Sequence, residues 1–495
     1  MKRNIIIAFF SLLFMQGMTT SCGDWLDVDS SANVIEEVLF EDPEGYRTAV
    51  NGVYRLLAQP ALYGQQLTWG VASVLGNNYE ATRLPLSYRD LAAGDYKSAY
   101  SVSVVDPVWE AGYHAIANCN NVITYIEQED PAIFPEGKTE RDMILGEMLG
   151  ARAMVHLDLA RLFAPSTRAD DGKLYMPYAT VFPDRQPLRL TVTAMLGRVI
   201  ADLERSRDLL ADCDTTFNAS RMSNYTGRLQ PPVGLNATTF FSTRGTRFNY
   251  FAALSILARA YQWRDAPGDR QRAYEAARQV YRFSTDKTWF SFTPSTNLAT
   301  TENNIYRKMP HDILFALYNS NLYTIVAGAS PNSTQVFVVK NDAVLFESDL
   351  DDARVYLINT DKTSRRWSMP TGNQTGYPTA DIIRYQGPLA PVARLSEMIY
   401  IMCEYLSDTD LPRAVTLLEK VRTARGAKAL LGVPSREEFL QALYLEMTRE
   451  FLAEGQTFYL YKRLNAPIYN GLGAMDMTGR YVLPLPRSES AYINL

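Results

Sequence analysis

Histidine and cysteine are scarce in this sequence, and the motifs that they form in metalloproteins are missing. The chain holds three histidines, His114, His156 and His311. They stand far apart in sequence and form no HExxH motif, so no pair of metal ligands is indicated. Besides Cys22, the cysteines are Cys119, Cys213 and Cys403, an odd number without CxxC spacing. These absences exclude a disulfide framework and a zinc site, and we expect the latter cysteines to be buried thiols.

Motifs for nucleotide binding and nucleophilic catalysis are also missing. The sequence contains no GxSxG elbow. Residues 137–139 end like a phosphate-binding loop, but Ala132 stands where that loop needs a glycine. Gly471 and Gly473 lack the third glycine of a dinucleotide fingerprint. We therefore expect a protein that is not an enzyme and that needs no cofactor.

Three glutamates near the carboxyl end are the nearest approach to a catalytic group. Glu446, Glu450 and Glu454 recur at helical spacing, and a pair of carboxylates is what glycoside hydrolysis requires. Like charges four residues apart are, however, typical of a solvated or ion-paired helix face. We interpret these residues as structural.

Charge and hydrophobicity favour a soluble globular body. The formal net charge is −5 and 47% of the residues are hydrophobic, so nucleic acid is not an expected partner. After the first residues, no apolar stretch is long enough to cross a membrane, and no long linker divides the chain. We expect an amino-terminal region, 22–248, and a carboxyl-terminal region, 249–495, in one continuous body.

The first residues have the pattern of a lipoprotein signal. A short basic start precedes an eleven-residue apolar run, 5–15, which is too short to act as a stop-transfer helix. The small residues 19–21 then lead to Cys22. We expect 1–21 to be a removed signal peptide and Cys22 to carry lipid such as palmitate. The alternative is an ordinary signal peptide with Cys22 as a bystander.

Beyond the signal, apolar residues recur at helical spacing and alternation typical of strands is rare. The sequence predicts helices at 43–59, 108–128, 140–164, 249–265, 270–283, 394–406 and 411–426. The helices at 108–128 and 140–164 should form an antiparallel hairpin. Three long stretches between helices look loop-rich and are typical of functional loops, namely 165–190, 212–248 and 284–390.

A repeated spacing of small and large residues appears in two of these helices. Ala153, Leu157 and Ala160 recur at i, i+4 and i+7 before Pro165, and residues 253–260 repeat the spacing. This is typical of the second helix of a tetratricopeptide repeat. With the pair at 394–426, the sequence predicts repeat-type helical pairs. A generic helical bundle is the alternative.

The two ends of the mature chain carry motifs of one family. Cys22 is followed by the tract Asp-Trp-Leu-Asp at 24–27, and the chain closes with Leu-Pro-Leu-Pro at 483–486. Residues 434–463 resemble a capped helix with the pattern E-R-x-x-E-L-x-x-E-G followed by R-x-x-D-L-x-R. The matching residues are Glu446, Glu450, Glu454, Gly455 and Arg463, and the departures are Met447, Thr457 and Leu460. The sequence therefore resembles the RagB/SusD family of Bacteroidetes surface lipoproteins, with a thinner ion network expected in this segment.

The resemblance implies a SusD-like fold, mainly α, and a protein anchored by lipid in the outer membrane that faces the outside of the cell. It also implies capture of glycan fragments and their delivery to a SusC-like TonB-dependent transporter. The family includes oligopeptide-uptake members, so a peptide ligand is the alternative. A surface glycoside hydrolase is the alternative from another functional class, and the missing catalytic motifs argue against it.

Aromatic residues supply the candidate ligand site. They make up 12% of the chain, with 30 Tyr and 6 Trp, and aromatic faces stack on sugar rings. In the family the pocket is built largely from the segment after the first helix and from loops around the repeats. The candidates are Trp69, Asn77, Asn78, Tyr79, Arg83, Tyr88 and Tyr96, with Trp289 and Trp367 from later loops. Trp69 fits equally well as a stacking platform or as a core anchor.

Overall fold

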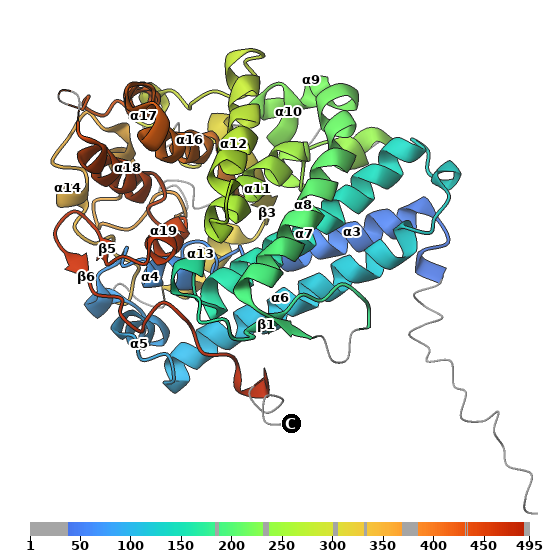
Figure 1. The fold of residues 1–495 in the computed structure, drawn as a ribbon, viewed down its shortest axis with the longest axis horizontal. Coiled ribbons are helices and arrows are strands. Elements are labelled where there is room, and N and C mark those ends of the chain that lie inside the picture. The colour runs from blue at the N-terminus through green and yellow to red at the C-terminus, as the bar shows by residue number, and fades with distance from the viewer. Residues whose placement is uncertain are drawn as a thin grey trace, which may run out of the picture.

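The computed structural model describes residues 38–183, 188–230, 237–299, 305–330, 334–368, 385–430, 432 and 434–489. The expected signal peptide, 1–21, and Cys22 lie outside these residues. The described part is mainly α-helical with three two-stranded antiparallel sheets, which confirms the predicted fold class (Figure 1).

The longer helices of the described part are α3 (Pro43–Leu57), α6 (Ala99–Ile126), α7 (Lys138–Phe163), α8 (Val192–Asp212), α11 (Tyr250–Arg264), α12 (Asp269–Thr285), α16 (Leu395–Thr409), α17 (Leu411–Ala424), α18 (Arg436–Glu450) and α19 (Gln456–Leu464). The shorter ones are α4 (Val71–Leu75), α5 (Leu86–Ala93), α9 (Ala219–Met222), α10 (Tyr225–Leu229), α13 (Leu322–Ala329) and α14 (Asp342–Leu345). The strands are β1 (Met176–Pro177), β2 (Arg189–Leu190), β3 (Ile313–Tyr318), β4 (Leu389–Arg394), β5 (Ile468–Tyr469) and β6 (Ala474–Met475). One-turn helices lie at Ala81–Arg83, Pro131–Ile133, Thr167–Ala169, Cys213–Phe217, Ala237–Phe241, Arg244–Thr246, Ser295–Asn297, Pro310–Asp312 and Ala353–Leu357.

Six long helices form a serial array in which each packs against the next. α7 packs on α8, α8 on α11, α11 on α12, α12 on α16 and α16 on α17. α6 covers the other side of α7, as the expected hairpin requires, and α3 packs on α6 (Figure 1). Neighbour-to-neighbour packing is how helical repeats bury their apolar faces. The tetratricopeptide type of the repeat stays a prediction.

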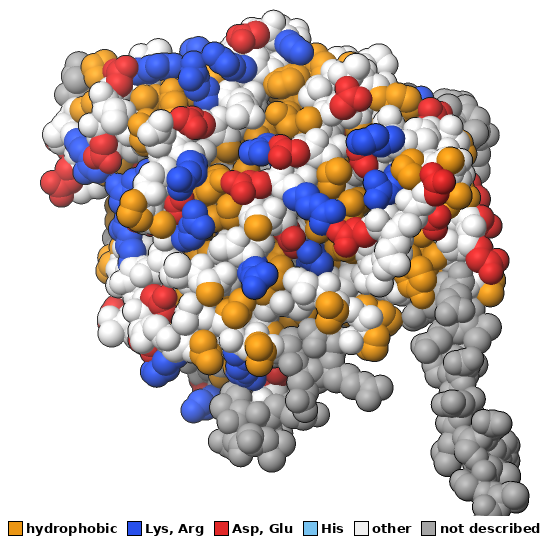
Figure 2. Space-filling view, turned by 45° about the vertical axis from the view of Figure 1, so that its right-hand side comes forward, with side chains coloured by type: hydrophobic (Ala, Val, Ile, Leu, Met, Phe, Trp, Pro, Cys, Tyr) orange, Lys and Arg blue, Asp and Glu red, His pale blue; other side chains and the backbone are white. Residues whose placement is uncertain are grey.

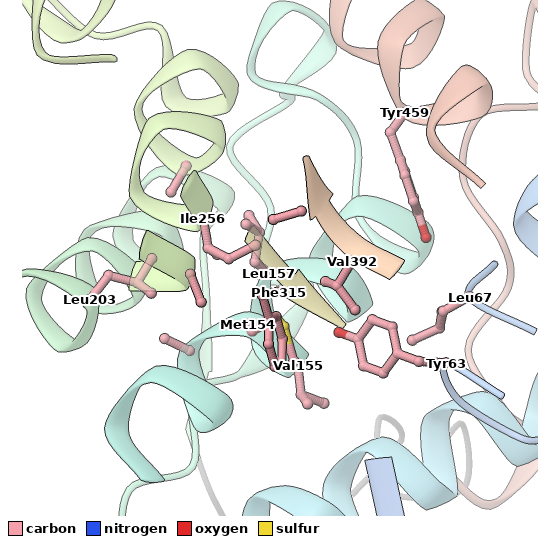
Figure 3. Packing of buried hydrophobic residues seen from close by; sticks show 14 of the residues in the cluster. Tyr63, Leu67, Met154, Val155, Leu157, Leu203, Ile256, Phe315, Val392 and Tyr459 are labelled. Atoms are coloured by element: carbon pink, nitrogen blue, oxygen red, sulfur yellow. The ribbon is translucent and has the colours of Figure 1, made fainter. Parts of the chain in front are cut away.

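The centre of the array lies around α7 and α11. Almost every side chain of α7 from Met143 onward is buried, because helices cover it on several sides. Ala153, Leu157 and Ala160 are all at most 1% exposed. Gly150 on the same helix lies so close to Phe248 that a Cβ would fall 2.0 Å from its ring. Figure 3 shows Met154, Val155 and Leu157 packed with Leu203 of α8, Ile256 of α11 and Phe315 of β3. Small residues thus let the helices approach closely, as their spacing predicts.

Helix ends mostly follow their capping signals. The Asp42 side chain accepts from the Gly45 N–H and Pro43 opens α3, while Asn249 caps α11 in the same way. The predicted starts of α3 and α11 agree with the structure. The helix expected at 108–128 instead begins at Ala99, because Ser98 caps it and Pro107 is accommodated within it. The prediction stopped at Pro107, since proline usually marks a helix boundary.

The stretch expected to run as one capped helix over 434–463 is divided in two. Ser435 and Glu438 form the capping box of α18, which ends at Glu450. Ala453 and Gly455 then take positive φ values of 59° and 82°, and α19 follows. A Cβ on Gly455 would lie 2.6 Å from the Leu67 carbonyl oxygen, so this turn needs glycine to pass the segment after α3.

The segments expected as loops contain short regular elements. β3, which lies inside the expected loop-rich stretch 284–390, pairs in an antiparallel sheet with β4 at the end of that stretch. Asn319, just after β3, donates from Nδ2 to the Ala58 carbonyl oxygen at the end of α3. The middle of this stretch is therefore tied both to its carboxyl end and to the first helix.

The surface in Figure 2 carries interspersed Lys or Arg and Asp or Glu side chains, with no large area of one sign on that face. Cys119, Cys213 and Cys403 are buried free thiols, as expected. Burial raises the pKa of the Cys119 and Cys213 thiols to about 12. Such thiols behave as small apolar side chains.

Candidate functional site

A pocket of about 470 Å³ brings together aromatic side chains from distant parts of the chain. We call it the aromatic pocket. Its aromatic lining residues are Trp69, Tyr79, Tyr323, Phe337 and Trp367. Hydroxyl side chains also line it, namely Thr324, Ser330, Thr363, Ser364 and Ser368, and the aliphatic Val326, Ala327 and Val336 complete the lining. Among the described residues no charged side chain lines this pocket.

Trp69 forms part of the fixed interior of the pocket. It is 2% exposed, and its indole N–H donates to the Gly64 carbonyl oxygen at 3.1 Å. Its ring meets Phe337 edge to face at 5.3 Å and lies tilted to Trp367 at 6.3 Å between centroids. A side chain so enclosed is a core anchor whose remaining surface helps to line the pocket. Of the two roles that the sequence left open for Trp69, burial supports the core anchor, and the stacking platform stays a prediction.

Trp367 is held in the same manner. Its indole N–H donates to the Ala453 carbonyl oxygen at 2.7 Å, in the turn between α18 and α19. The Lys308 ammonium nitrogen lies 3.6 Å from the centroid of the Trp367 ring. Burial lowers the pKa of Lys308 well below its ordinary value. The Trp367 ring is therefore fixed by a hydrogen bond at its edge and a lysine over its face.

Tyrosines surround Phe337. The Tyr79 hydroxyl donates to the Trp69 carbonyl oxygen at 2.9 Å, and the Tyr88 hydroxyl accepts from the Gln65 side chain at 2.8 Å. Both rings meet Phe337 edge to face, at 5.2 Å and 5.1 Å. Desolvation raises the pKa of Tyr88 to about 12, so its hydroxyl stays protonated at neutral pH. Tyr79 lines the pocket, whereas Tyr88 supports Phe337 from behind.

The other residues expected at the site have different surroundings. Asn77 accepts from the Lys340 ammonium at 3.2 Å, and Asn78 is buried, where it accepts from the Ala453 N–H at 3.4 Å. Arg83 is exposed and donates from Nε to the Thr334 carbonyl oxygen at 3.3 Å. The Tyr96 hydroxyl donates to the Arg480 carbonyl oxygen at 2.7 Å. None of these four residues lines the aromatic pocket.

Trp289 lies apart from the aromatic pocket. Its ring packs on Phe283 at 5.0 Å and on Phe251 at 6.0 Å, beside α11 and α12. Of the residues that the sequence suggested, the structure brings Trp69, Tyr79 and Trp367 to one cavity. Tyr323 and Phe337 were missed, because they stand in the 284–390 stretch, where no periodicity or motif marks them. The one signal in the sequence was that both residues are aromatic and stand in a long stretch expected to form functional loops.

A buried ion network fixes the wall of the pocket that carries Trp367. Arg366 donates to a Glu454 carboxylate oxygen at 2.5 Å, and Arg394 holds the same carboxylate at 2.7 Å. Burial alone raises the pKa of the Glu454 carboxyl, but Arg394 and Arg366 outweigh this effect and hold its pKa below the ordinary value. The residue next to Trp367 is thereby tied to the turn before α19.

The network continues along α18. Arg354 lies 2.7 Å from a Glu446 carboxylate oxygen, and Arg425 lies 2.5 Å from one of Glu450 and also pairs with Asp312. The expectation of a network thinner than the family pattern stays a prediction. It considered only the charges lost at Met447, Thr457 and Leu460 within the segment, whereas these cations come from elsewhere in the chain. The glutamates are ion-paired, as expected, but they are buried.

Catalytic and metal-binding geometry is not evident in the part of the chain that the structure describes. It contains no group of three or more His, Cys, Asp or Glu side chains placed to hold a metal ion. His156 is a core residue whose Nε2 accepts from the Ala179 N–H at 3.1 Å and whose Nδ1 lies 2.9 Å from the Arg152 carbonyl oxygen. Within the same residues, no helix combines the length and apolar character needed to cross a membrane.

Comparison with known proteins finds similarity to one family. Residues 24–226 match the model of a SusD-like family described as starch-binding and associating with the outer membrane. A SusD superfamily protein of Bacteroides thetaiotaomicron is similar in structure, with a TM-score of 0.66 and 21% identity over 91% of this chain and 98% of that one. A SusD homolog of the same organism gives 0.67 and 16% identity over 91% and 96%. A SusD-like carbohydrate-binding protein of Bacteroides vulgatus gives 0.60 and 17% over 86% and 84%. No curated relative of the sequence was found.

The family match and the shared fold lead to one conclusion. Residues 24–226 match a SusD-like family, and the chain shares the fold of SusD superfamily structures. The resemblance read from the two ends of the sequence is confirmed.

Proposed function

We propose that this protein is a cell-surface lipoprotein that binds oligosaccharides in the aromatic pocket and passes them to a SusC-like TonB-dependent transporter. The observation that carries the proposal is the convergence of Trp69, Tyr79, Tyr323, Phe337 and Trp367 on one cavity in a SusD-like fold. Binding without chemical change is the activity that this site supports, because its described lining holds no carboxylate and no imidazole to act as a general acid or base.

The lining of the pocket matches an uncharged sugar. Aromatic rings offer apolar surface to the C–H faces of a sugar ring, and the serine and threonine hydroxyls both donate and accept hydrogen bonds. The rings of Trp69 and Trp367 are fixed by hydrogen bonds to carbonyl oxygens, so little conformational entropy is lost when a ligand binds. An apolar peptide side chain is the alternative occupant, and the test below separates the two.

Tyr323 is the lining residue best suited to a test. Unlike Trp69 it is only half-buried, so its loss removes contact surface without a large core cavity. We expect Tyr323→Ala to weaken binding of neutral oligosaccharides at least tenfold in calorimetry, with an unchanged melting temperature. Tyr100→Ala is the matched control, because Tyr100 is 51% exposed on α6 and lines no part of the pocket.

Three outcomes would contradict the proposal. Equal oligosaccharide affinity of Tyr323→Ala and the unaltered protein would exclude the pocket. Binding of peptides but not of oligosaccharides would assign the peptide ligand instead. Cleaved ligand in mass analysis after incubation would identify a hydrolase.

Lipid attachment at Cys22 completes the proposal. A tethered protein meets its transporter at a high effective concentration even when the contact between them is weak. We expect Cys22→Ala to move the protein from the membrane fraction to the soluble fraction, because the lipid supplies the membrane affinity. The released protein should keep its melting temperature, since Cys22 precedes the described body. Retention of Cys22→Ala in washed membranes would contradict lipid anchoring.

A further inference from the structure

A second and larger cavity runs along α3. We call it the α3 groove, and its volume is about 1110 Å³. The exposed side of α3 from Glu44 to Arg55 forms one wall, residues 239–247 form another, and residues 318–325 close its end. Unlike the aromatic pocket, it is lined by charged side chains and amides.

The floor of the groove is rigid. Arg247 donates to the buried Glu147 carboxylate at 2.8 Å, and the Tyr54 hydroxyl donates to the same carboxylate at 2.8 Å. Arg247 also covers the Phe240 ring at 4.0 Å from its centroid, with Arg47 at 5.1 Å. Arg47 in turn donates to the buried Glu140 at 2.7 Å. These guanidinium groups are already neutralised by carboxylates, so they shape the groove rather than supply free charge.

The two ends of the groove differ in charge. Glu44 is the one acidic residue in its described lining, and it is paired with Arg47 at 2.5 Å. Arg55 stands eleven positions further along α3, which is about 16 Å at 1.5 Å per residue. Arg55 is exposed, and among the described residues it forms no ion pair. Its end of the groove therefore carries one positive charge without a counterion.

Amides surround that charge. Asn51, Gln59 and Asn321 are exposed and line the groove with Arg55. A guanidinium group gives a carboxylate or a sulfate two parallel donors, and amides bind the neighbouring hydroxyls. This combination fits an acidic sugar unit better than a neutral one.

One short helix separates the two cavities. Ile325 of α13 lines the α3 groove, whereas Tyr323 and Thr324 of the same helix line the aromatic pocket. An α-helix with its side chains is about 10 Å across, so one oligosaccharide of several units can reach past α13 from pocket to groove.

We propose that the α3 groove is a second binding site, which takes an acidic unit of an oligosaccharide at Arg55 while neutral units occupy the aromatic pocket. The second half of this statement rests on the proposed function. The ligand class is then an oligosaccharide that carries carboxylate or sulfate groups. Arg55 acts as the residue that selects acidic over neutral ligands.

The test compares acidic oligosaccharides with neutral counterparts of the same length in calorimetry. The probes are oligogalacturonate, heparin-derived and alginate-derived fragments, and the carboxyl-reduced or desulfated form of each. We expect at least one acidic fragment to bind at least tenfold more tightly than its neutral form, with a preference that falls as salt is raised. Arg55→Gln should abolish the preference and leave the neutral affinity unchanged. Arg413→Gln, on the exposed side of α17, is the matched control and should preserve it.

The outcomes separate this inference from the proposed function. Loss of the preference in Arg55→Gln together with loss of neutral affinity in Tyr323→Ala supports both sites. A preference that survives Arg55→Gln, or equal affinity for acidic and neutral forms throughout, overturns the groove proposal and leaves the pocket standing. An effect of Arg55→Gln without any effect of Tyr323→Ala supports the groove and excludes the pocket.

Discussion

The helical array around α7 and the layer around α18 are both buried and both contain ion pairs, yet apolar side chains make up a larger share of the buried residues in α7 than in α18. Along α7 apolar contacts, with Ala153, Leu157 and Ala160 at the helix contacts, alternate with buried ion pairs such as that of Glu147 with Arg244. Around α18 the interior holds arginines and carboxylates, among them Arg354, Arg425 and Glu450. Apolar contacts are non-directional, whereas buried ion pairs are satisfied only in one geometry.

This difference in chemistry corresponds to the kind of segment that each region joins. The array joins helices whose own periodicity already defines them. The ion layer instead joins segments with little regular structure, because Arg354 and Arg366 reach α18 and the turn after it from the long stretch before β4. Since Trp367 follows Arg366, we infer that the charged layer positions the aromatic pocket.

Acid should give the largest effect and should act in two steps, at the pH where histidine takes up a proton and at the pH where the buried carboxylates do. Burial lowers the pKa of His156 in α7 to about 3, so the folded array keeps this histidine neutral. An unfolded histidine takes up its proton near pH 6.5, so stability begins to fall below that value. The pKa values of Glu446, Glu450 and Glu454 are lowered in the folded chain because arginines outweigh desolvation. Their contribution is complete above the unfolded pKa of about 4.3 and is lost as pH falls further.

Melting curves from pH 8 to pH 3 measure this effect. We expect two successive declines, and His156→Gln should remove the upper one while leaving the lower one. A melting temperature that is constant between pH 6.5 and pH 3 would contradict the assignment.

Removing one buried cation should have the next largest effect. Arg425→Met leaves the carboxylates of Glu450 and Asp312 without their shared partner. Loss of one member of a buried ion pair costs about 3–5 kcal/mol of unfolding free energy. Denaturant titration measures the loss, and Arg413→Met at an exposed position of α17 should stay within about 0.5 kcal/mol of the unaltered protein. Equal stability of the two variants would show that the ion layer is not structural.

The apolar array should respond to added volume. Ala153 is fully buried on α7, and Ala153→Phe should overpack the contact at a cost of about 1–3 kcal/mol. The control is Ala201→Phe on the exposed side of α8, for which no overpacking is expected. Thermal unfolding of both variants tests the difference. An unchanged melting temperature for Ala153→Phe would remove Ala153 from the helix contact.

The sequence predicted the array better than the ion layer, for a physical reason. Helices such as α3, α11 and α17 are set by apolar spacing and by caps within a few residues, so local patterns suffice to place them. The partners of Glu450 and Glu454 come from segments with no pattern of their own. The expectation of a thinner network considered charges only within 434–463 and so could not include these partners.

The candidate site shows the same division. Trp69 and Tyr79 follow the first helix closely and could be suggested from that position. Phe337 reaches them only through the fold, since it stands in the long stretch between α12 and β4. No spacing in the sequence relates these residues to one another. For a site assembled from several loops, the sequence can therefore predict which types of residue line it but not which individual residues do.

Helix caps should give the smallest effect and should be equal in the two regions. Asp410 caps α17 in the array by accepting from the Arg413 N–H at 3.2 Å, and Ser435 caps α18 by accepting from the Glu438 N–H at 3.3 Å. Both are exposed, so each cap satisfies a local backbone donor and does not depend on the chemistry of the interior beneath it. Asp410→Ala and Ser435→Ala should each cost about 1 kcal/mol in denaturant titration, and Ser435→Thr should restore most of the loss. A much larger cost for Ser435→Ala than for Asp410→Ala would mean that the cap of α18 depends on the ion pairs beneath it. The two regions would then differ at their helix ends as well as in their interiors.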